Sequence, residues 1–253
     1  SSEILSPPRI AQGVVVVHTA DGRLVALDAL SGHVLWRYQS DIPVLTLRGT
    51  SSPLLVHGRV VAGFANGKLV CLDLQRGHVL WAVAIAIPRG RTDLERVVDI
   101  DGELAFRDGV VYAVSYQGKA AAVALETGQV LWSREMSSYA GLAADDERVY
   151  VSDAEGIVWG LERHSGAPLW RQVHLRRRYL TAPAIHGGSV AVGDGEGYLH
   201  WLSPEDGRFL ARWRVDSKGL YAPMAVAGPT LYAYGRGGWL AALEIEPKQE
   251  DGT

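Results

Sequence analysis

A pair of glycines ten residues apart recurs along the chain, and this repeat constrains the fold more than any other feature. The pairs are Gly22 and Gly32, Gly67 and Gly77, Gly118 and Gly128, Gly156 and Gly166, and Gly197 and Gly207, with a sixth copy starting at Gly238. Successive first glycines lie 38 to 51 residues apart, which brackets the ~40–45 residues of a four-stranded propeller blade. The repeat predicts an all-β propeller with six blade repeats over residues 1–246, followed by a disordered tail at 247–253.

Each copy of the repeat has the pattern of four short strands. In the second copy we expect strands at residues 54–56, 60–65, 68–74 and 78–84, separated by turn residues. The pair Asn66-Gly67 stands between the second and third strands and is a signal for a type I′ hairpin turn. No segment has helical periodicity, so the fold class is all-β with antiparallel blades.

One tryptophan per copy stands four residues after the second glycine. These are Trp36, Trp81, Trp132 and Trp170, whereas the fifth copy has Ala211 at this position and Trp213 two residues later. A large flat ring wedged between neighbouring blades would bury much apolar area. We therefore expect a structural role, in which each blade is stable only against its neighbours.

Composition excludes several classes of function. The formal net charge of -3 gives no reason to expect a nucleic acid or an anionic membrane as partner. The single cysteine, Cys71, excludes an internal disulfide or a cysteine-based metal site. No apolar run reaches the ~18 residues of a membrane span. The first eight residues do not resemble a signal peptide, which indicates a mature form or a fragment.

No motif points to catalysis or to a cofactor. The eight histidines form none of the usual zinc-binding pairs, and a Gly-x-Ser-x-Gly element is absent. Residues 193–197 are glycine-rich, but they lie between two expected strands and open no helix, so a phosphate-binding loop is not indicated. The densest basic run, His174 to Tyr179, could bind phosphates, although a solvated or partner-facing loop fits an acidic chain better.

Two families resemble this chain. Residues 26–36 and 124–132 resemble the tryptophan-docking repeat of the quinoprotein propellers, which include dehydrogenases and cofactor-free members. Residues 45–49, 93–101 and 192–209 are similar to three more specific stretches of the BamB family, propeller lipoproteins of the bacterial outer-membrane β-barrel assembly machinery. The second resemblance implies an eight-bladed, periplasmic, lipid-anchored protein. This chain shows six repeats and no cysteine near its start.

The repeat also places two unusual loops relative to each other. Aligning the copies on the turn glycines Gly58 and Gly109 puts Arg48 and Asp99 ten residues earlier, at equivalent positions of adjacent blades. We expect both on one face near the central channel, where they could pair. They could also be ordinary solvated charges, worth ~0–1 kcal/mol.

The BamB resemblance implies that these loops bind the periplasmic domains of BamA. The implied partner-binding residues are Leu45, Leu47, Arg48, Gly49, Arg96, Asp99 and Asp101. Leu45, Leu47 and Arg48 would be anchors, because an arginine beside exposed apolar side chains is typical of interface hot spots. Asp99 and Asp101 would orient Arg48 or pair with cations of the partner.

The resulting expectation is a non-catalytic scaffold, without cofactor or metal, on the periplasmic face of the outer membrane. Its partners would be BamA-type domains, with nascent outer-membrane proteins as a second class and no nucleic acid. One alternative is a fragment of a quinoprotein (PQQ-dependent) dehydrogenase. Another is a sugar-binding or signalling propeller, which an exposed aromatic stack on one face would favour.

Overall fold

The computed structural model describes residues 2–43, 45–47, 49–88, 91–92, 94–95 and 97–245. Its strands form six antiparallel sheets, called blades 1 to 6 below. Blade 1 contains β1 (Arg9–Ala11), β2 (Val14–Thr19), β3 (Arg23–Asp28) and β4 (Val34–Gln39). Blade 2 contains β5 (Leu54–Val56), β6 (Arg59–Gly63), β7 (Lys68–Asp73) and β8 (Val79–Ala84). Blade 3 contains β9 (Ala105–Arg107), β10 (Val110–Val114), β11 (Lys119–Ala124) and β12 (Val130–Glu135).

The second half of the chain repeats the same plan. Blade 4 contains β13 (Leu142–Ala144), β14 (Arg148–Ser152), β15 (Val158–Glu162) and β16 (Pro168–Gln172). Blade 5 contains β17 (Ala184–His186), β18 (Ser189–Gly193), β19 (Tyr198–Leu202) and β20 (Phe209–Arg214). Blade 6 has three strands among the described residues: β21 (Ala225–Ala227), β22 (Thr230–Tyr234) and β23 (Leu240–Glu244).

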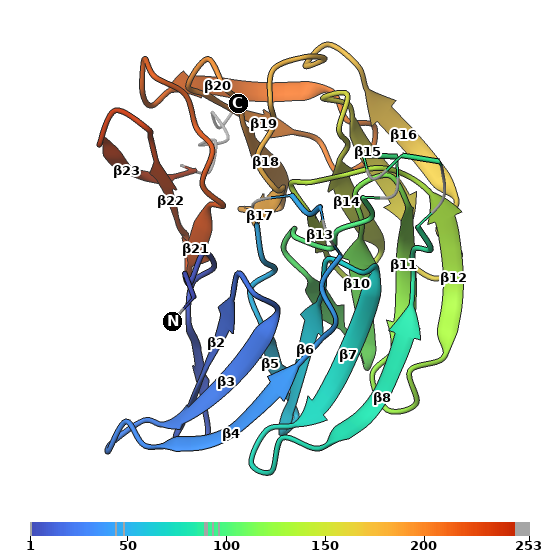
Figure 1. The fold of residues 1–253 in the computed structure, drawn as a ribbon. Helices are drawn as coiled ribbons and strands as arrows, with labels where there is room; N and C mark the ends of the chain where they lie inside the picture. The colour runs from blue at the N-terminus through green and yellow to red at the C-terminus, as the bar shows by residue number, and fades with distance from the viewer. Residues whose placement is uncertain are drawn as a thin grey trace, which may run out of the picture.

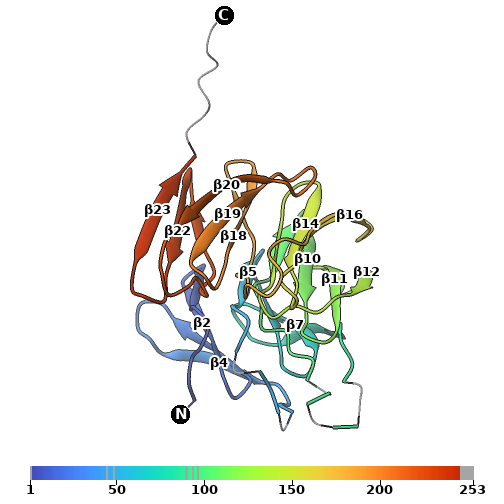
Figure 2. The ribbon, with the colours of Figure 1, turned by 90° about the horizontal axis from the view of Figure 1, so that it is seen from above.

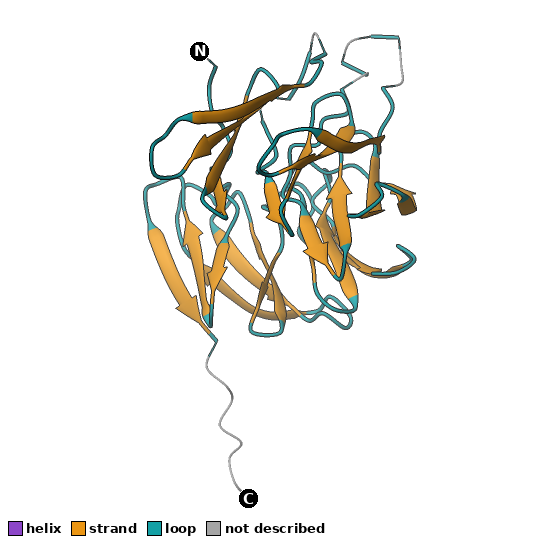
Figure 3. Ribbon diagram, turned by 90° about the horizontal axis from the view of Figure 1, so that it is seen from below, coloured by secondary structure: helices purple, strands orange, loops and turns teal. Residues whose placement is uncertain are grey.

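The blades follow one another in chain order around a common centre, as Figure 1 shows, with the first strands β5, β13 and β17 innermost. The predicted β-propeller is therefore confirmed, and the strands expected for the second repeat agree with β5 to β8 within about a residue or two at each end. Figure 3 shows only strands and loops. Accordingly, no helix able to cross a bilayer occurs among the described residues.

The repeated tryptophans dock each blade onto the next, as expected. Each indole N–H donates to a backbone carbonyl of the following blade: Trp36 to Leu74 at 2.8 Å, Trp81 to Leu125 at 2.7 Å, Trp132 to Arg163 at 2.8 Å and Trp170 to Pro204 at 2.7 Å. The second glycine of the following copy lies under the ring. A Cβ at Gly77, for example, would come within 2.4 Å of Trp36. The pairing of tryptophan with glycine thus explains why both recur at fixed spacing.

Blade 5 lacks this tryptophan and docks in another way. Trp201 on β19 lies opposite Ala211 in the register, so the ring comes from the neighbouring strand. Its Nε1 donates to His186 Nδ1 at 3.0 Å, and His186 Nε2 then lies 2.7 Å from the Pro229 carbonyl of blade 6. With Nδ1 as acceptor, the neutral imidazole carries its proton on Nε2 and donates to Pro229. A two-step relay replaces the missing direct contact.

The hairpin at Asn66-Gly67 differs from the prediction. A type I′ turn needs positive φ at both central residues, but only Gly67 has it, at +74°. Gly67 N–H instead donates to the Phe64 carbonyl at 3.0 Å, which closes a four-residue turn ending at the glycine. The expected type I′ turn is wrong because only the glycine takes the left-handed conformation, which is costly for a side chain with a Cβ.

Five buried apolar clusters join blade 1 to blade 2 and so on to blade 6. Among the described residues, no such cluster joins blade 6 back to blade 1. Blade 6 instead exposes Tyr232, Tyr234 and Leu240, by 39%, 54% and 65%. The packing of the described chain is therefore an open series of blades and not a ring closed by a sixth core.

Candidate functional site: paired loops beside the central channel

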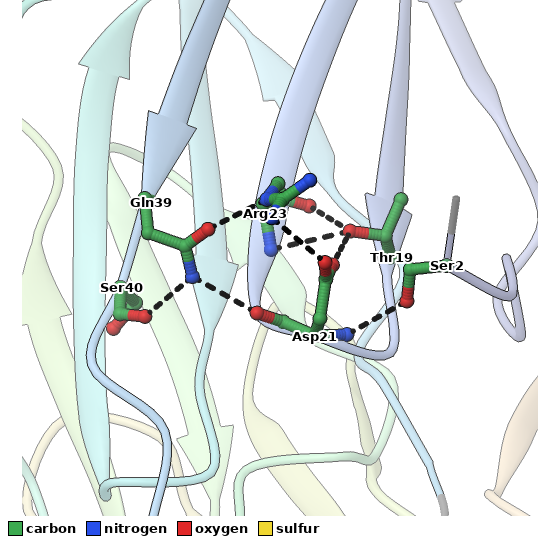
Figure 4. Close-up of polar contacts among 6 residues, drawn as sticks. All are labelled: Ser2, Thr19, Asp21, Arg23, Gln39 and Ser40. Atoms are coloured by element: carbon green, nitrogen blue, oxygen red, sulfur yellow. Dashed lines mark hydrogen bonds and ion pairs between the residues drawn. The ribbon is translucent and has the colours of Figure 1, made fainter.

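The loop after blade 1, residues 40–53, starts from a polar network that fixes its first residues. Figure 4 shows Gln39 at the end of β4 donating from Nε2 to the carbonyls of Asp21 and Ser40, at 2.9 and 2.8 Å. Asn66 of blade 2 donates to Ser40 Oγ at 3.1 Å and to the Asp41 carbonyl at 3.0 Å. Hydrogen bonds from both blades therefore set the direction in which the loop leaves the sheet.

The loop after blade 2, residues 85–104, lies beside it. The described parts of both loops project from the same side of the molecule in Figures 2 and 3. The backbone N–H of Leu47 donates to the Asp99 carboxylate. Gly49 passes so close to Asp101 that a Cβ there would lie 3.0 Å from Oδ2. The structure thus brings four of the predicted residues, Leu47, Gly49, Asp99 and Asp101, to one place.

Burial changes the interpretation of Asp99. Its side chain is fully buried (0% exposed). Burial raises the pKa of Asp99 to about 6, opposed by the hydrogen bond from Leu47. Burial and the nearby Asp99 charge raise the pKa of Asp101 to about 7. The pairing of this enclosed carboxylate with a cation of the partner would require a change of conformation and stays a prediction. The side chain instead holds the Leu47 backbone.

The site exposes several apolar side chains. Leu45 is 42% exposed, and Leu47 is partly exposed and lines the central cavity. Sequence reasoning missed three further exposed side chains on the same two loops: Ile42, Ile87 and Leu94, at 39%, 66% and 67%. The signal that selected Leu45, an apolar residue in a connecting loop, would also have found them.

Two predicted residues, Arg48 and Arg96, lie outside the described residues. The pairing of Arg48 with Asp99 therefore stays a prediction. The tail 247–253 also lies outside the described residues.

The glycine-rich stretch 193–197 has a structural explanation. Asp194 is fully buried and accepts hydrogen bonds from the backbone N–H groups of Glu196 and Tyr198, at 3.0 and 2.9 Å, from Arg178 at 3.0 Å and from His200 at 2.8 Å. Burial opposes ionisation, but these bonds outweigh it and lower the pKa of Asp194. The carboxylate has its partners within the protein. Nowhere in the described residues do three or more potential ligands gather into a metal site.

The fold and these loops define a class: a tryptophan-docked propeller with two adjacent long loops that expose apolar side chains at one side of its channel. The family model described as outer membrane protein assembly factor BamB matches residues 1–172 and 161–247. The chain therefore belongs to the BamB family.

Individual relatives agree. The chain is 49% identical to outer membrane protein assembly factor BamB of Pseudomonas aeruginosa, over 82% of this chain and 54% of the relative. It is 38% identical to BamB of Yersinia pestis, over 96% of this chain and 62% of the relative. The chain thus spans between half and two thirds of the length of these relatives.

Solved structures give the same result for the fold. The crystal structure of BamB from Moraxella catarrhalis matches with a TM-score of 0.91 and 30% identity, covering 97% of this chain and 73% of that one. A europium-containing methanol dehydrogenase matches with a TM-score of 0.73 and 14% identity, covering 96% of this chain and 67% of that one. The second likeness concerns the fold alone.

Proposed function

We propose that the chain is a non-catalytic scaffold that docks on the periplasmic domains of BamA and assists the folding and insertion of outer-membrane proteins. The names of the relatives support this, since they are outer membrane protein assembly factors. The proposal extends to the location: the periplasmic face of the outer membrane, with a lipid anchor on the intact protein.

The observation that carries the proposal is the Leu47–Asp99 hydrogen bond. A carboxylate removed from water costs free energy, and the raised pKa of Asp99 expresses that cost. The bond holds the backbone at Leu47, while the Leu45 side chain is exposed. An apolar loop that is held rigid before binding loses less conformational entropy when it binds. We propose Leu45, Leu47, Arg48, Gly49 and Arg96 as the contact residues, with Asp99 and Asp101 positioning them.

The affinity for purified BamA periplasmic domains tests the proposal. Truncating both Leu45 and Leu47 to alanine should weaken binding by ~1–3 kcal/mol for each side chain that acts as an anchor. Leu30 offers a matched control, since it is 99% exposed in the β3–β4 turn of blade 1. Leu30→Ala should leave the affinity unchanged. Equal affinities for the wild type and the double variant would remove the docking proposal.

A quinoprotein enzyme remains the alternative from another class. It predicts a change in absorbance and dye-linked alcohol oxidation after addition of quinone and Ca²⁺. We expect neither.

A further inference from the structure

A cavity of about 590 Å³ occupies the centre of the molecule and is lined by residues from the inner loops and strand ends of all six blades. Leu47 stands in its wall on the blade 2 side. Three tyrosines from the loops before blades 4, 5 and 6 also line it: Tyr139, Tyr179 and Tyr221. They are 37%, 65% and 50% exposed. Their close placement is consistent with the raised pKa of Tyr139, which burial and then the neighbouring Tyr179, Asp153 and Tyr221 cause. We call these three residues the tyrosine wall.

A second hollow of about 430 Å³ adjoins the cavity and shares Tyr139 and Tyr179 with it. Its other lining residues include Arg176 and Arg177, which belong to the densest basic run of the sequence. Residues 174–179 are called the arginine loop below. The two hollows together form a groove that leads from Leu47, past the tyrosine wall, to the arginine loop.

The arginine loop has a strained backbone. Arg177 and Tyr179 both have left-handed φ angles, 62° and 54°, which cost of the order of 1–3 kcal/mol for residues with side chains and persist only where the surroundings enforce them. Here the Arg177 N–H donates to the Glu155 carbonyl at 2.9 Å, and the Gly195 N–H donates to the Arg178 carbonyl at 2.6 Å. The Arg178 side chain is tied to the buried Asp194 at 3.0 Å. A simple solvated loop would not need such a costly conformation.

Unlike Arg178, which pairs with Asp194 and Glu196, Arg176 and Arg177 have little compensation for their charge within the protein. The closest carboxylate to Arg176 is Glu155, at 3.8 Å, and both side chains are largely exposed, so the pair contributes little. Arg177 forms no ion pair with any of the described residues. A cationic end of the groove is therefore available to a partner.

We infer that the tyrosine wall and the arginine loop form the second half of the docking surface, and that they accept an extended, acidic polypeptide segment of the docking partner. The inference rests on the proposed function. Apolar side chains of the segment pack on the tyrosines, which offer rigid, amphipathic contact area. A carboxylate of the segment pairs with Arg176 or Arg177, since the planar guanidinium matches it with two hydrogen bonds. A polypeptide fits better than a bilayer, because two of the tyrosines face two adjoining hollows and a flat membrane surface does not enter them.

Affinities of the whole chain for purified BamA periplasmic domains test the inference. Tyr139→Ala with Tyr221→Ala should raise the Kd about tenfold, and so should Arg176→Glu with Arg177→Glu. Tyr232→Ala is the matched control for the tyrosines, because Tyr232 is 39% exposed on β22. Arg37→Glu, at an exposed position of β4, is the matched control for the charge reversal. Both controls should change the Kd less than twofold, and circular dichroism melting should show that all variants are folded.

The outcomes separate the two proposals. If the wild type binds, Leu47→Ala weakens binding and both double variants bind like the wild type, the docking proposal stands and the inference is overturned. If the wild type does not bind, the docking proposal fails and the inference fails with it. If the double variants keep their affinity for the domains but lose affinity for phosphatidylglycerol vesicles or an N-acetylglucosamine oligomer, the groove serves a membrane or a glycan, and the inference is overturned.

Discussion

Gly166→Ala tests whether each tryptophan requires a glycine in the next blade. Gly166 has φ +70°, and a Cβ built there would lie 2.6 Å from Cε3 and 2.8 Å from Cδ2 of Trp132. Gly32 is the natural control. Its φ is +71°, but none of the described residues lies within 4 Å of its Cβ position, so no tryptophan ring of this chain packs there. The two substitutions differ in the tryptophan contact and hardly in backbone conformation.

The expected magnitudes follow from these contacts. A left-handed backbone costs a residue with a Cβ about 1–2 kcal/mol, and this is the whole expected effect of Gly32→Ala. At Gly166 the added methyl group also overpacks the ring, which typically costs about 1–3 kcal/mol. The ring cannot move away freely, because Trp132 Nε1 donates to the Arg163 carbonyl at 2.8 Å. We therefore expect Gly166→Ala to lower the free energy of unfolding by about 2–5 kcal/mol.

The double variant isolates the contact. In a Trp132→Ala background the ring is absent, so Gly166→Ala should cost only the backbone component that Gly32→Ala reports. The difference between the two backgrounds is the coupling free energy, expected at about 1–3 kcal/mol. Urea denaturation followed by far-ultraviolet circular dichroism measures all four values. Equal costs at Gly32 and Gly166, or no coupling with Trp132, would refute the docking explanation of the repeat.

Three further outcomes are expected from buried groups. The folded pKa of Asp99 is raised to about 6 from an ordinary 3.8. The free energy of unfolding is therefore highest below pH 4, where Asp99 is protonated in both states, and this stability is lost as the pH rises through 6. Asp99→Asn can still accept the Leu47 hydrogen bond and carries no charge. In thermal or urea denaturation it should be more stable than the wild type by about 2–3 kcal/mol at pH 8 and equal to it at pH 4. A variant that is less stable than the wild type at pH 8 would contradict this. Cys71 is buried, and burial raises its pKa to about 11, so a thiol reagent at pH 8 should modify it only after unfolding; rapid reaction of the native protein would contradict this. Trp201→Phe leaves His186 Nδ1 without its donor and should lower the free energy of unfolding by about 1–3 kcal/mol, whereas a neutral result would show that the relay to blade 6 is dispensable.

The regular part of the fold could be predicted because it depends on residues at fixed spacing. A turn glycine and a docking tryptophan each satisfy a local requirement that is the same in every blade. The contact between blades 5 and 6 could not be predicted in this way. There the ring moves from the fourth strand to Trp201 on the third, and the hydrogen bond passes through His186. Spacing within one repeat contains no information about such an exchange between strands.

The site was predictable in position but not in depth. Alignment of the repeats placed Asp99 on the loop beside the Leu45–Gly49 loop, and the hydrogen bond from Leu47 agrees with that. Alignment gives the place of a residue around the ring but not its distance from solvent, so the complete burial of Asp99 was missed. The channel-facing tyrosines were missed for a related reason. Their loops differ in length, and the residues do not share one position in the repeat.

The lengths of the loops between blades relate the repeated blade framework to the proposed docking function. Tryptophan, glycine and the strand ladders hold successive blades together, so the connections between a fourth strand and the next first strand are free to vary. The connection between blades 3 and 4 needs only residues 136–141, whereas the longest two, 40–53 and 85–104, are adjacent and carry the proposed docking residues. The next longest, 173–183, contains the arginine loop. Long connections without secondary structure are usually functional in compact domains. All three loops border the same channel. The connections that are longer than a propeller needs are therefore placed where one partner could contact more than one of them at once.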